Sequence, residues 1–95
     1  MHIITRKRII EAEEEHPDCE TALRGWYLVM KGTSFNNFAE LKKAFNSVDK
    51  VGNLYVFNVG GNKLRLITAI HFKTKKVYIR AILTHREYDQ NNWKD

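Results

Sequence analysis

Two apolar runs separated by four residues, near the carboxyl end of the chain, constrain its fold more than any other feature. They cover residues 64–72 and 77–83, and residues 73–76 between them are mostly lysine. Within each run apolar and polar side chains tend to alternate, which is typical of a β-strand. A connection of four residues suits a hairpin loop. The spacing therefore predicts an antiparallel hairpin with Phe72 opposite Val77.

The alternation also assigns the side chains of this hairpin to two faces. On the face predicted to join the core lie Leu64, Leu66, Ile70, Phe72, Ile79, Ala81 and Leu83. The polar side chains fall on the opposite face, which holds Lys63, Arg65, His71, Tyr78 and Arg80 beside Ile67 and Ala69. We therefore expect Arg65 and Arg80 to share a face, together with His71 and Tyr78.

Composition limits what this hairpin belongs to. The chain has 95 residues, of which 43% are hydrophobic and 28% charged, so we expect one globular domain over residues 1–95. Its net charge of +5 favours an acidic partner, either nucleic acid or an acidic protein segment, although solubility alone also explains such a charge. The single Cys19 excludes an internal disulfide and fits a reducing compartment.

Two further features bear on location. No apolar run approaches the roughly 20 residues that span a bilayer, and the first residues do not form an apolar segment of the signal-peptide type. We therefore expect a cytoplasmic protein without a membrane association.

The first half of the chain predicts a short strand and two helices. His2 to Thr5 reads as the strand, Thr5 as the cap of a helix that Pro17 ends, and Asp18 as the cap of the next helix. The second helix carries an apolar stripe of Ala22, Leu23, Trp26, Tyr27 and Met30, and Gly32 closes it.

The middle of the chain predicts a third, short helix and one more strand. Asn37 and Glu40 have the spacing of a capping box, so Phe38, Leu41 and Phe45 face inward. Lys42 and Lys43 then project outward, either as ordinary surface lysines or toward a phosphate backbone. A loop through Asp49 and Lys50 leads to a strand at residues 54–59, and Gly60-Gly61-Asn62 forms a tight turn.

Together these elements predict an α+β fold. Strands joined by tight turns form an antiparallel sheet, and the N-terminal helices must cover one of its faces with their apolar stripes. The face that carries the arginines stays open. A short helix or tail at residues 87–93 follows the last strand.

Residue types exclude several kinds of site. The sequence has no Cys pair and no His-x-x-x-His spacing for a zinc site, no Lys-Ser/Thr after a glycine loop for a P-loop, and no serine-hydrolase nucleophile elbow. A basic face with imidazole and phenol groups nearby suits phosphodiester chemistry, because fixed cations stabilise the charge that develops on a phosphorane.

A family resemblance enters at these residues. Val59-Gly60-Gly61-Asn62, Leu64-Arg65 and Thr84-His85-x-Glu87-Tyr88-Asp89 resemble the motifs of HigB-type toxins, in the RelE/ParE superfamily, and the opening Met1-His2-Ile3-Ile4 and Phe45-x-Ser47-x-Asp49 are also similar. The resemblance implies a RelE-like compact domain that cleaves messenger RNA on the ribosome. It also implies inhibition by a cognate HigA-like helix-turn-helix antitoxin, and a reaction without cofactor or metal.

The resemblance further implies roles for individual residues. Arg65 and Arg80 would hold the scissile phosphate, His85 or Tyr88 would transfer protons, and Asp89 would orient His85. An ordinary imidazole titrates at about pH 6.5 and a phenol at about pH 10, so we favour His85 as the acid/base. Tyr88 would then stack on a base or donate a hydrogen bond. RNA contacts are expected from Lys42, Lys43, Lys63, His71 and Tyr78.

Other interpretations stay open from the sequence. The arginines also read as ordinary strand charges, His85 as a structural hydrogen-bonding group, and Tyr88 as an aromatic plug over the core. At the level of function, the alternatives are a non-enzymatic superfamily member that binds a protein such as gyrase, and a plain RNA-binding module. Trp93 is expected to anchor the last segment.

Overall fold

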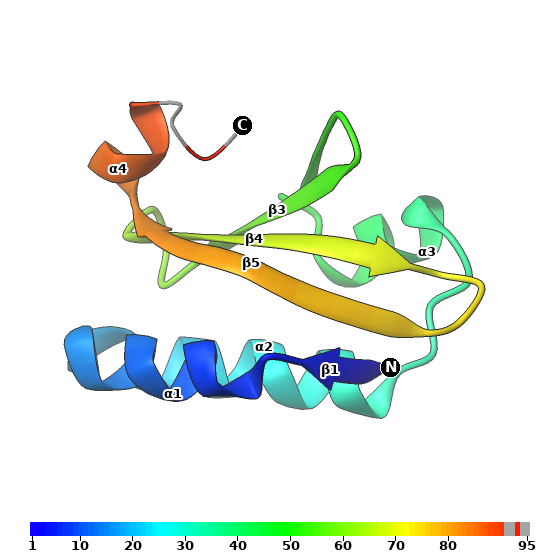
Figure 1. The fold of residues 1–95 in the computed structure, drawn as a ribbon, viewed down its shortest axis with the longest axis horizontal. Coiled ribbons are helices and arrows are strands. Elements are labelled where there is room, and N and C mark those ends of the chain that lie inside the picture. The colour runs from blue at the N-terminus through cyan, green and yellow to red at the C-terminus, as the bar shows by residue number, and fades with distance from the viewer. Residues whose placement is uncertain (91–92, 94–95) are drawn as a thin grey trace.

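A computed structural model describes residues 1–90 and Trp93, and in this part of the chain five strands form one sheet (Figure 1). The elements in order are β1 (His2–Ile4), α1 (Arg6–Glu15), the 3-10 helix η1 (Pro17–Cys19), α2 (Glu20–Gly32), α3 (Phe38–Ala44), β2 (Asp49–Val51), β3 (Leu54–Val59), β4 (Leu64–His71), β5 (Lys76–Thr84) and α4 (His85–Asp89). The strand order is β1-β5-β4-β3-β2, with all neighbours antiparallel except β1 and β5. The predicted α+β class is confirmed, with one parallel edge pair added.

The N-terminal helices cover one face of the sheet, as predicted, and lie below it in Figure 1. On α2 the side chains of Leu23, Trp26 and Met30 are buried, and Trp26 meets Phe57 of β3 edge to face at 5.4 Å. Burial of each such side chain contributes about 1.5–3 kcal/mol. The apolar stripe predicted from helical spacing therefore builds most of the core on this side.

The short helix α3 is capped almost as predicted. The Asn37 side chain accepts a hydrogen bond from the backbone N–H of Glu40 at 2.9 Å. The Glu40 carboxylate accepts in return from the backbone of Asn36, also at 2.9 Å, and not from Asn37. Leu41 is fully buried, which fixes the inward face of this helix.

The predicted cap at Thr5 is wrong in its chemistry. Thr5 occupies the position before α1, but its side chain makes no capping hydrogen bond. Its Oγ1 instead accepts from the backbone N–H of Ile79 at 3.0 Å and also contacts main-chain carbonyls of Ile4 and Ile79. Because β1 runs parallel to β5, with Ile4 beside Tyr78, this hydroxyl links the strand crossover to β5.

The predicted helix cap at Asp18 is also wrong. Residues Pro17–Cys19 form η1, and α2 begins after Cys19, which makes no side-chain cap. The Asp18 carboxylate pairs with Lys63 Nζ at 2.7 Å, and this hydrogen bond lowers the pKa of Asp18. Both side chains are exposed, so the pair adds little stability. Lys63, predicted to contact RNA, is thus held beside η1.

The turn between β3 and β4 depends on its glycines. Gly60 and Gly61 have φ angles of 68° and 69°, a region that residues with a Cβ rarely adopt. At Gly60 an added Cβ would also lie only 2.8 Å from the Sγ atom of the buried Cys19. The turn therefore packs directly on the start of α2.

The register of the β4–β5 hairpin differs from the predicted one. Val77 lies opposite Ile70, not Phe72, because β4 ends at His71 and the turn takes a left-handed residue at Lys75, with φ 58°. The turn has four residues, as predicted, but it lies one residue earlier in the chain, at 72–75 and not at 73–76.

A β-bulge changes the faces of β5. Ile67 is opposite Ala81 and Thr68 is opposite Ile79, so Arg80 is an extra residue without a partner of its own on β4. Beyond the bulge it is Ile82 that packs on the core. The prediction that Ala81 and Leu83 face the core is therefore wrong. Side chains of a strand alternate between its two faces, and one inserted residue reverses this alternation for the residues that follow.

The face away from α1 and α2 is not bare. Val56, Ile67 and Arg65, which alternate with core residues, have only 3%, 1% and 8% of their surface exposed. Helix α4 lies on this side of the sheet in Figure 1. The predicted loop through Asp49 and Lys50 contains the edge strand β2, paired with β3. The expectation of a wholly open face is therefore only partly met.

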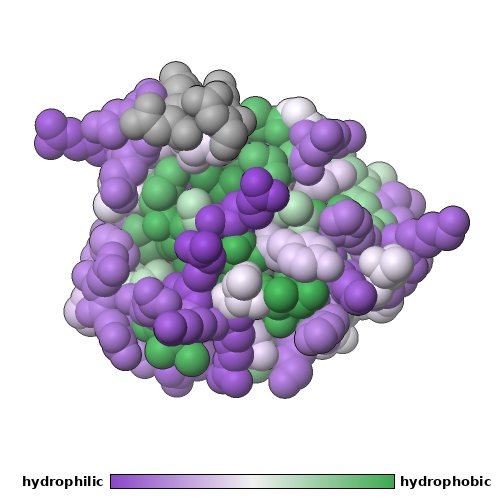
Figure 2. Space-filling model, viewed as in Figure 1, coloured by the Kyte–Doolittle hydropathy of each residue, from purple (hydrophilic) through white to green (hydrophobic). Residues whose placement is uncertain are grey.

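The outer surface mixes polar and apolar groups. In the orientation of Figure 1, hydrophilic residues dominate the rim, and near the middle a hydrophilic strip runs between hydrophobic patches (Figure 2). None of the helices in the described part of the chain is long and apolar enough to cross a membrane.

Candidate active site

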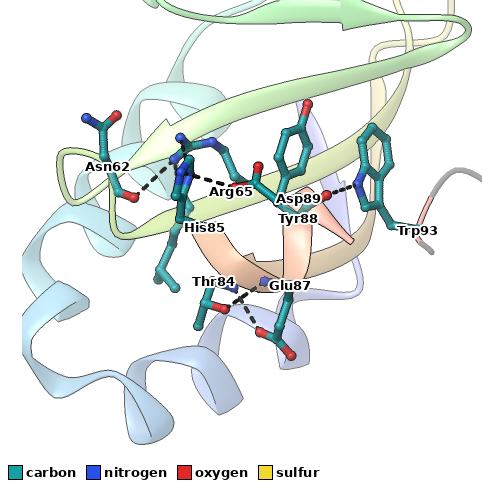
Figure 3. A network of polar contacts seen from close by, with 9 residues as sticks. Asn62, Arg65, Thr84, His85, Glu87, Tyr88, Asp89 and Trp93 are labelled. Atoms are coloured by element: carbon teal, nitrogen blue, oxygen red, sulfur yellow. Dashed lines mark hydrogen bonds and ion pairs between the residues drawn. The ribbon is translucent and has the colours of Figure 1, made fainter. Parts of the chain in front are cut away.

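The candidate site forms where helix α4 follows strand β5, and a capping box builds this junction (Figure 3). Thr84 Oγ1 accepts from the backbone N–H of Glu87 at 3.2 Å, and the Glu87 carboxylate accepts from the backbone N–H of Thr84 at 2.9 Å. The latter bond lowers the pKa of Glu87. A backbone hydrogen bond of 3.2 Å from His85 to the carbonyl of Lys63 ties the helix to the start of β4. The predicted helix at residues 87–93 thus starts earlier, and residues 91 and 92 lie outside the described residues.

Arg65 is the buried cation of the site. Its Nη1 donates to the carbonyls of Asn62 and Leu64, each at 3.3 Å, and its Nη2 lies 2.9 Å from Nδ1 of His85. Only 8% of the residue surface is exposed. A guanidinium with little water around it interacts more strongly with an anion than an exposed one does.

These contacts decide which nitrogen of His85 carries the proton. A guanidinium has no acceptor and keeps all its protons, so Nδ1 of His85 must accept the hydrogen bond from Arg65. The proton of the neutral ring therefore sits on Nε2, which faces Oδ2 of Asp89 at 3.3 Å. Arg65, His85 and Asp89 form one row of polar contacts, and Asp89 lies where it was expected to orient His85.

Tyr88 lies between Arg65 and Trp93 (Figure 3). The Arg65 Cζ is 5.7 Å from the centre of the Tyr88 ring, and the Trp93 ring stacks on it at 4.7 Å with an angle of 15°. Trp93 Nε1 also donates to the carbonyl of Tyr88 at 2.8 Å, so Trp93 anchors this segment as predicted. A nucleobase cannot stack on Tyr88 in this arrangement, which leaves the phenol hydroxyl as its functional group.

The phenol of Tyr88 is kept in its neutral form. Burial raises the pKa of Tyr88, and the carboxylates of Asp49 and Asp89 act in the same direction, whereas Arg65 lowers it. A neutral phenol donates one hydrogen bond without ionising. Tyr88 therefore suits hydrogen bonding to a phosphate better than proton abstraction.

The two predicted arginines are not brought together. Arg65 is opposite Leu83, and Arg80 lies three positions back along β5, in the bulge. Arg80 is exposed and makes no hydrogen bond or ion pair with any residue in 1–90 or with Trp93. His71 and Tyr78 do meet, edge to face at 5.4 Å, on the same face as predicted.

The lysines of α3 differ from each other. Lys42 Nζ donates to the carbonyl of Val48 at 2.8 Å, which closes the end of the helix. Lys43 is exposed and has no polar partner in the described part of the chain. Of the pair predicted to contact RNA, only Lys43 is uncommitted.

Sequence reasoning missed several contributors to the site. The carbonyls of Asn62 and Leu64 position Arg65, and Asp49 acts on Tyr88 from β2. Only the capping box could have been read directly, because Thr84 and Glu87 have its spacing. Among the described residues, no group of three or more His, Cys, Asp or Glu could hold a metal ion.

Comparison with known proteins identifies the family of this chain. Residues 19–91 match the model of the HigB toxin family, described as the RelE-like toxic component of a toxin–antitoxin system. The mRNA interferase toxin HigB of Escherichia coli K12 is 40% identical over 92 residues, which cover 94% of this chain and 88% of that protein. The mRNA interferase HigB of Escherichia coli O6:H1 is 37% identical over 93 residues, or 95% and 90% of the two chains. The chain therefore belongs to the HigB family of RelE-like toxins.

Proposed function

We propose that this protein is a toxin that cleaves messenger RNA on the ribosome, without a metal ion or cofactor. The row formed by Arg65, His85 and Asp89 carries the proposal, because it joins a buried cation to a proton-transfer group and its orienting carboxylate. The names of the relatives, mRNA interferases, support the same reaction.

In the proposed reaction the 2′-hydroxyl of the RNA is the nucleophile. Its oxygen attacks the adjacent phosphorus, the bond from phosphorus to the 5′-oxygen breaks, and the products are a 2′,3′-cyclic phosphate and a 5′-hydroxyl. One proton leaves the 2′-oxygen and one reaches the departing 5′-oxygen. The protein has to position the strand, neutralise the negative charge on the phosphate oxygens and move these protons.

Arg65 binds the scissile phosphate, and this frees His85. A charge-assisted bond from guanidinium to phosphate is stronger than a bond to a neutral imidazole. RNA binding therefore draws Arg65 from Nδ1 of His85, which lies 2.9 Å away in the free protein. The released Nδ1 has a lone pair that can take the proton of the 2′-hydroxyl. Asp89, 3.3 Å from Nε2, stabilises the resulting imidazolium.

Tyr88 donates a hydrogen bond to the phosphate or to the leaving oxygen. Its ring is held between Arg65 and Trp93, and the raised pKa of Tyr88 keeps the proton on the phenol. A fixed donor of this kind stabilises charge that develops in the transition state.

Partners follow from the family. A toxin–antitoxin system implies an antitoxin for this chain. We propose that the antitoxin is HigA-like, carries a DNA-binding helix-turn-helix and blocks access to the site. The net charge of +5 favours an acidic partner surface and supports association with ribosomal RNA.

The test is to express the protein briefly and map new 5′ ends on translated messages. The proposal expects new 5′-hydroxyl ends within messages engaged by ribosomes, growth arrest, and recovery when the neighbouring antitoxin gene is co-expressed. The matched control is His85→Gln at equal soluble level, which should produce far fewer ends. Growth arrest with intact messages and a DNA-damage response would contradict cleavage and favour a gyrase-type target.

A further inference from the structure

The amino group of Met1 lies beside the end of α2 and is fully engaged in hydrogen bonds there (Figure 1). It donates to the carbonyls of Met30 and Thr33, each at 2.9 Å, and to the carbonyl of Lys31 at 3.2 Å. An ammonium group has three N–H donors, so this geometry uses all of them. Met1 is also part of the core, with only 9% of its surface exposed.

We infer that the nitrogen of Met1 is a modification site: the toxin reaches its active structure only with a free amino group there, and a formyl group keeps it inactive. The relatives are bacterial proteins, and bacterial translation starts each chain with N-formylmethionine. The formyl group is removed by hydrolysis, in which the C–N bond breaks. The oxygen of water joins the formyl carbon, which leaves as formate, and both protons of water end on the nitrogen as the ammonium forms.

The end of α2 explains why an ammonium is required. The last carbonyls of a helix have no partner within it, and a glycine with a positive φ commonly forms the turn that satisfies them. The sequence predicts this role for Gly32, but among the described glycines only Gly52, Gly60 and Gly61 have a positive φ. The amino group of Met1 takes the place of that cap. Its charge also suits the negative end of the helix dipole.

A formyl group would remove the charge and two of the three donors. The nitrogen becomes an amide with one N–H, and the formyl oxygen is a further acceptor. Two carbonyls of the three would then lose their donor, and a polar group left unpaired in a buried position is costly. Burial already lowers the pKa of the Met1 amine, and the charge of Lys75 acts in the same direction. The ammonium therefore depends on its carbonyl partners.

The position of Met1 is connected to the candidate site through two strands. The backbone N–H of His2 donates to the carbonyl of Lys75 at 2.8 Å, and Ile3 pairs with Val77 of β5. Strand β5 leads directly into α4, whose first residue is His85. Displacing Met1 should therefore loosen β1 from the strand that carries the site. The inference rests on the proposed function for its effect on messages, whereas its effect on folding rests on these contacts alone.

The test is to synthesise the radiolabelled protein in a reconstituted bacterial translation system that lacks deformylase, and to treat half of the product with purified deformylase. Both halves are then digested with a protease under native conditions. Because the protease cleaves the opened form, the rate of digestion follows the fraction of open protein, and the formylated chain should be digested about tenfold faster or more. Treatment with deformylase should restore the resistance.

A pair of insertions separates the position of the amino group from its mere presence. Serine and glycine inserted between Met1 and His2 keep a free amine but move it away from the carbonyls of α2. After treatment with deformylase this variant should still be digested as fast as the formylated chain. The same two residues added after Asp95 are the matched control and should leave the resistance of the deformylated chain unchanged.

Three outcomes would overturn the inference. The first is equal digestion of the formylated and deformylated chains, and the second is an insertion variant as resistant as the deformylated wild type. The third comes from the mass of active toxin purified from cells. A retained formyl group, a missing Met1 or residues before Met1 would each contradict a requirement for a free amine at this position.

A parallel cleavage assay on programmed ribosomes separates this inference from the proposed function. If deformylation raises protease resistance but neither form cleaves messages, the requirement for a free amine is supported and the nuclease fails. If both forms cleave messages equally and resist the protease equally, the requirement fails and the nuclease stands. When both are correct, cleavage should appear only after treatment with deformylase.

Discussion

The Nη2 atom of Arg65 lies 2.9 Å from Nδ1 of His85 and thereby joins the buried start of β4 to the first residue of α4. In the proposed reaction these two groups are the phosphate-binding cation and the proton acceptor. In the free protein each one satisfies the other. The proposal therefore requires RNA to replace this contact, so that the substrate itself activates the site.

Replacing Arg65 by lysine should slow the cleavage step by about 10- to 1,000-fold, the scale of losing one charge-stabilising donor. Lysine keeps the charge but cannot bond two carbonyls and His85 together, as the guanidinium does. The measurement is single-turnover cleavage on programmed ribosomes. Because Arg65 is buried, some stability is also lost, about 1–3 kcal/mol for the unpaired carbonyls.

The control for this change is Arg86→Lys, at an exposed position of the nearby helix α4. It should cleave at close to the wild-type rate. Equal rates for Arg65→Lys and the wild type would remove Arg65 from the reaction.

His85→Gln and Asp89→Asn should affect the pH profile of cleavage differently. Imidazole can both take and give a proton near neutral pH whereas an amide cannot, so glutamine should reduce the rate and flatten its profile across about pH 5.5 to 8.5. Asp89→Asn removes only the carboxylate at 3.3 Å from Nε2, so a profile should persist at a lower rate. A wild-type rate and profile in His85→Gln would assign His85 a purely structural role.

Tyr88→Phe should reduce the rate without changing the shape of the profile near neutrality. The raised pKa of Tyr88 keeps the phenol neutral there, so the variant loses a hydrogen bond and no ionisation. The upward direction of this pKa shift also predicts how the stability of the fold changes at alkaline pH. A folded-state pKa above the ordinary value of about 10 favours folding below that pH, and this contribution disappears as the pH rises through the folded value.

Denaturant unfolding measured on both sides of about pH 10 tests this predicted loss of stability. The wild type should lose more stability across that range than Tyr88→Phe does. A rate profile that changes shape near pH 7 in Tyr88→Phe would make the phenol a proton carrier after all.

Lys43→Glu should weaken ribosome association and flatten its salt dependence, because an uncommitted cation that meets RNA backbone releases a counterion. Lys42→Met is the comparison. It removes the bond to the Val48 carbonyl at 2.8 Å, so it should lower stability more than it changes the salt slope. The measurement is ribosome binding at several salt concentrations, and an unchanged slope in Lys43→Glu would make Lys43 an ordinary surface residue.

Gly60→Ala should destabilise the fold more than Gly61→Ala. Both residues have φ near 68°, where a Cβ costs about 1–2 kcal/mol. Only at Gly60 would that Cβ lie 2.8 Å from Cys19 Sγ, while nothing lies within 4 Å at Gly61. The contact should add about 1–3 kcal/mol, measurable by urea unfolding. Equal losses of stability in the two variants would show that the Cys19 side chain can move aside at no cost.

Much of the fold was readable from local patterns. The strand Leu54–Val59, the glycine turn and the buried stripe of α2 follow from periodicity and from the φ angles that glycine allows. The bulge was not readable, because it arises from the pairing of two strands and not from either sequence alone. The same bulge leaves Arg80 without a partner on β4 and turns Ala81 and Leu83 away from the core.

The sequence indicated which residues lie together better than it indicated which atoms they contact. His85, Tyr88 and Asp89 were named from a motif, and the structure brings them to Arg65. The partner of His85 Nδ1 is Arg65 of β4, far away in the sequence, whereas Nε2 faces Asp89 of the same helix. Asp18 and Thr5 show the same limit. Each was predicted to cap the helix next to it, but Asp18 pairs with Lys63 beside the glycine turn and Thr5 bonds to Ile79 of β5.

The parallel pairing of β1 with β5 also determines when a nascent chain can become harmful. His2, Ile3 and Ile4 take their places only beside Lys76, Val77 and Tyr78. Strand β1 must therefore wait for β5, and contacts so far apart in sequence form slowly. Helix α4 follows β5 directly, so the edge of the sheet and the site are completed together. A chain interrupted before β5 should have neither, so such fragments should not harm the cell that makes them.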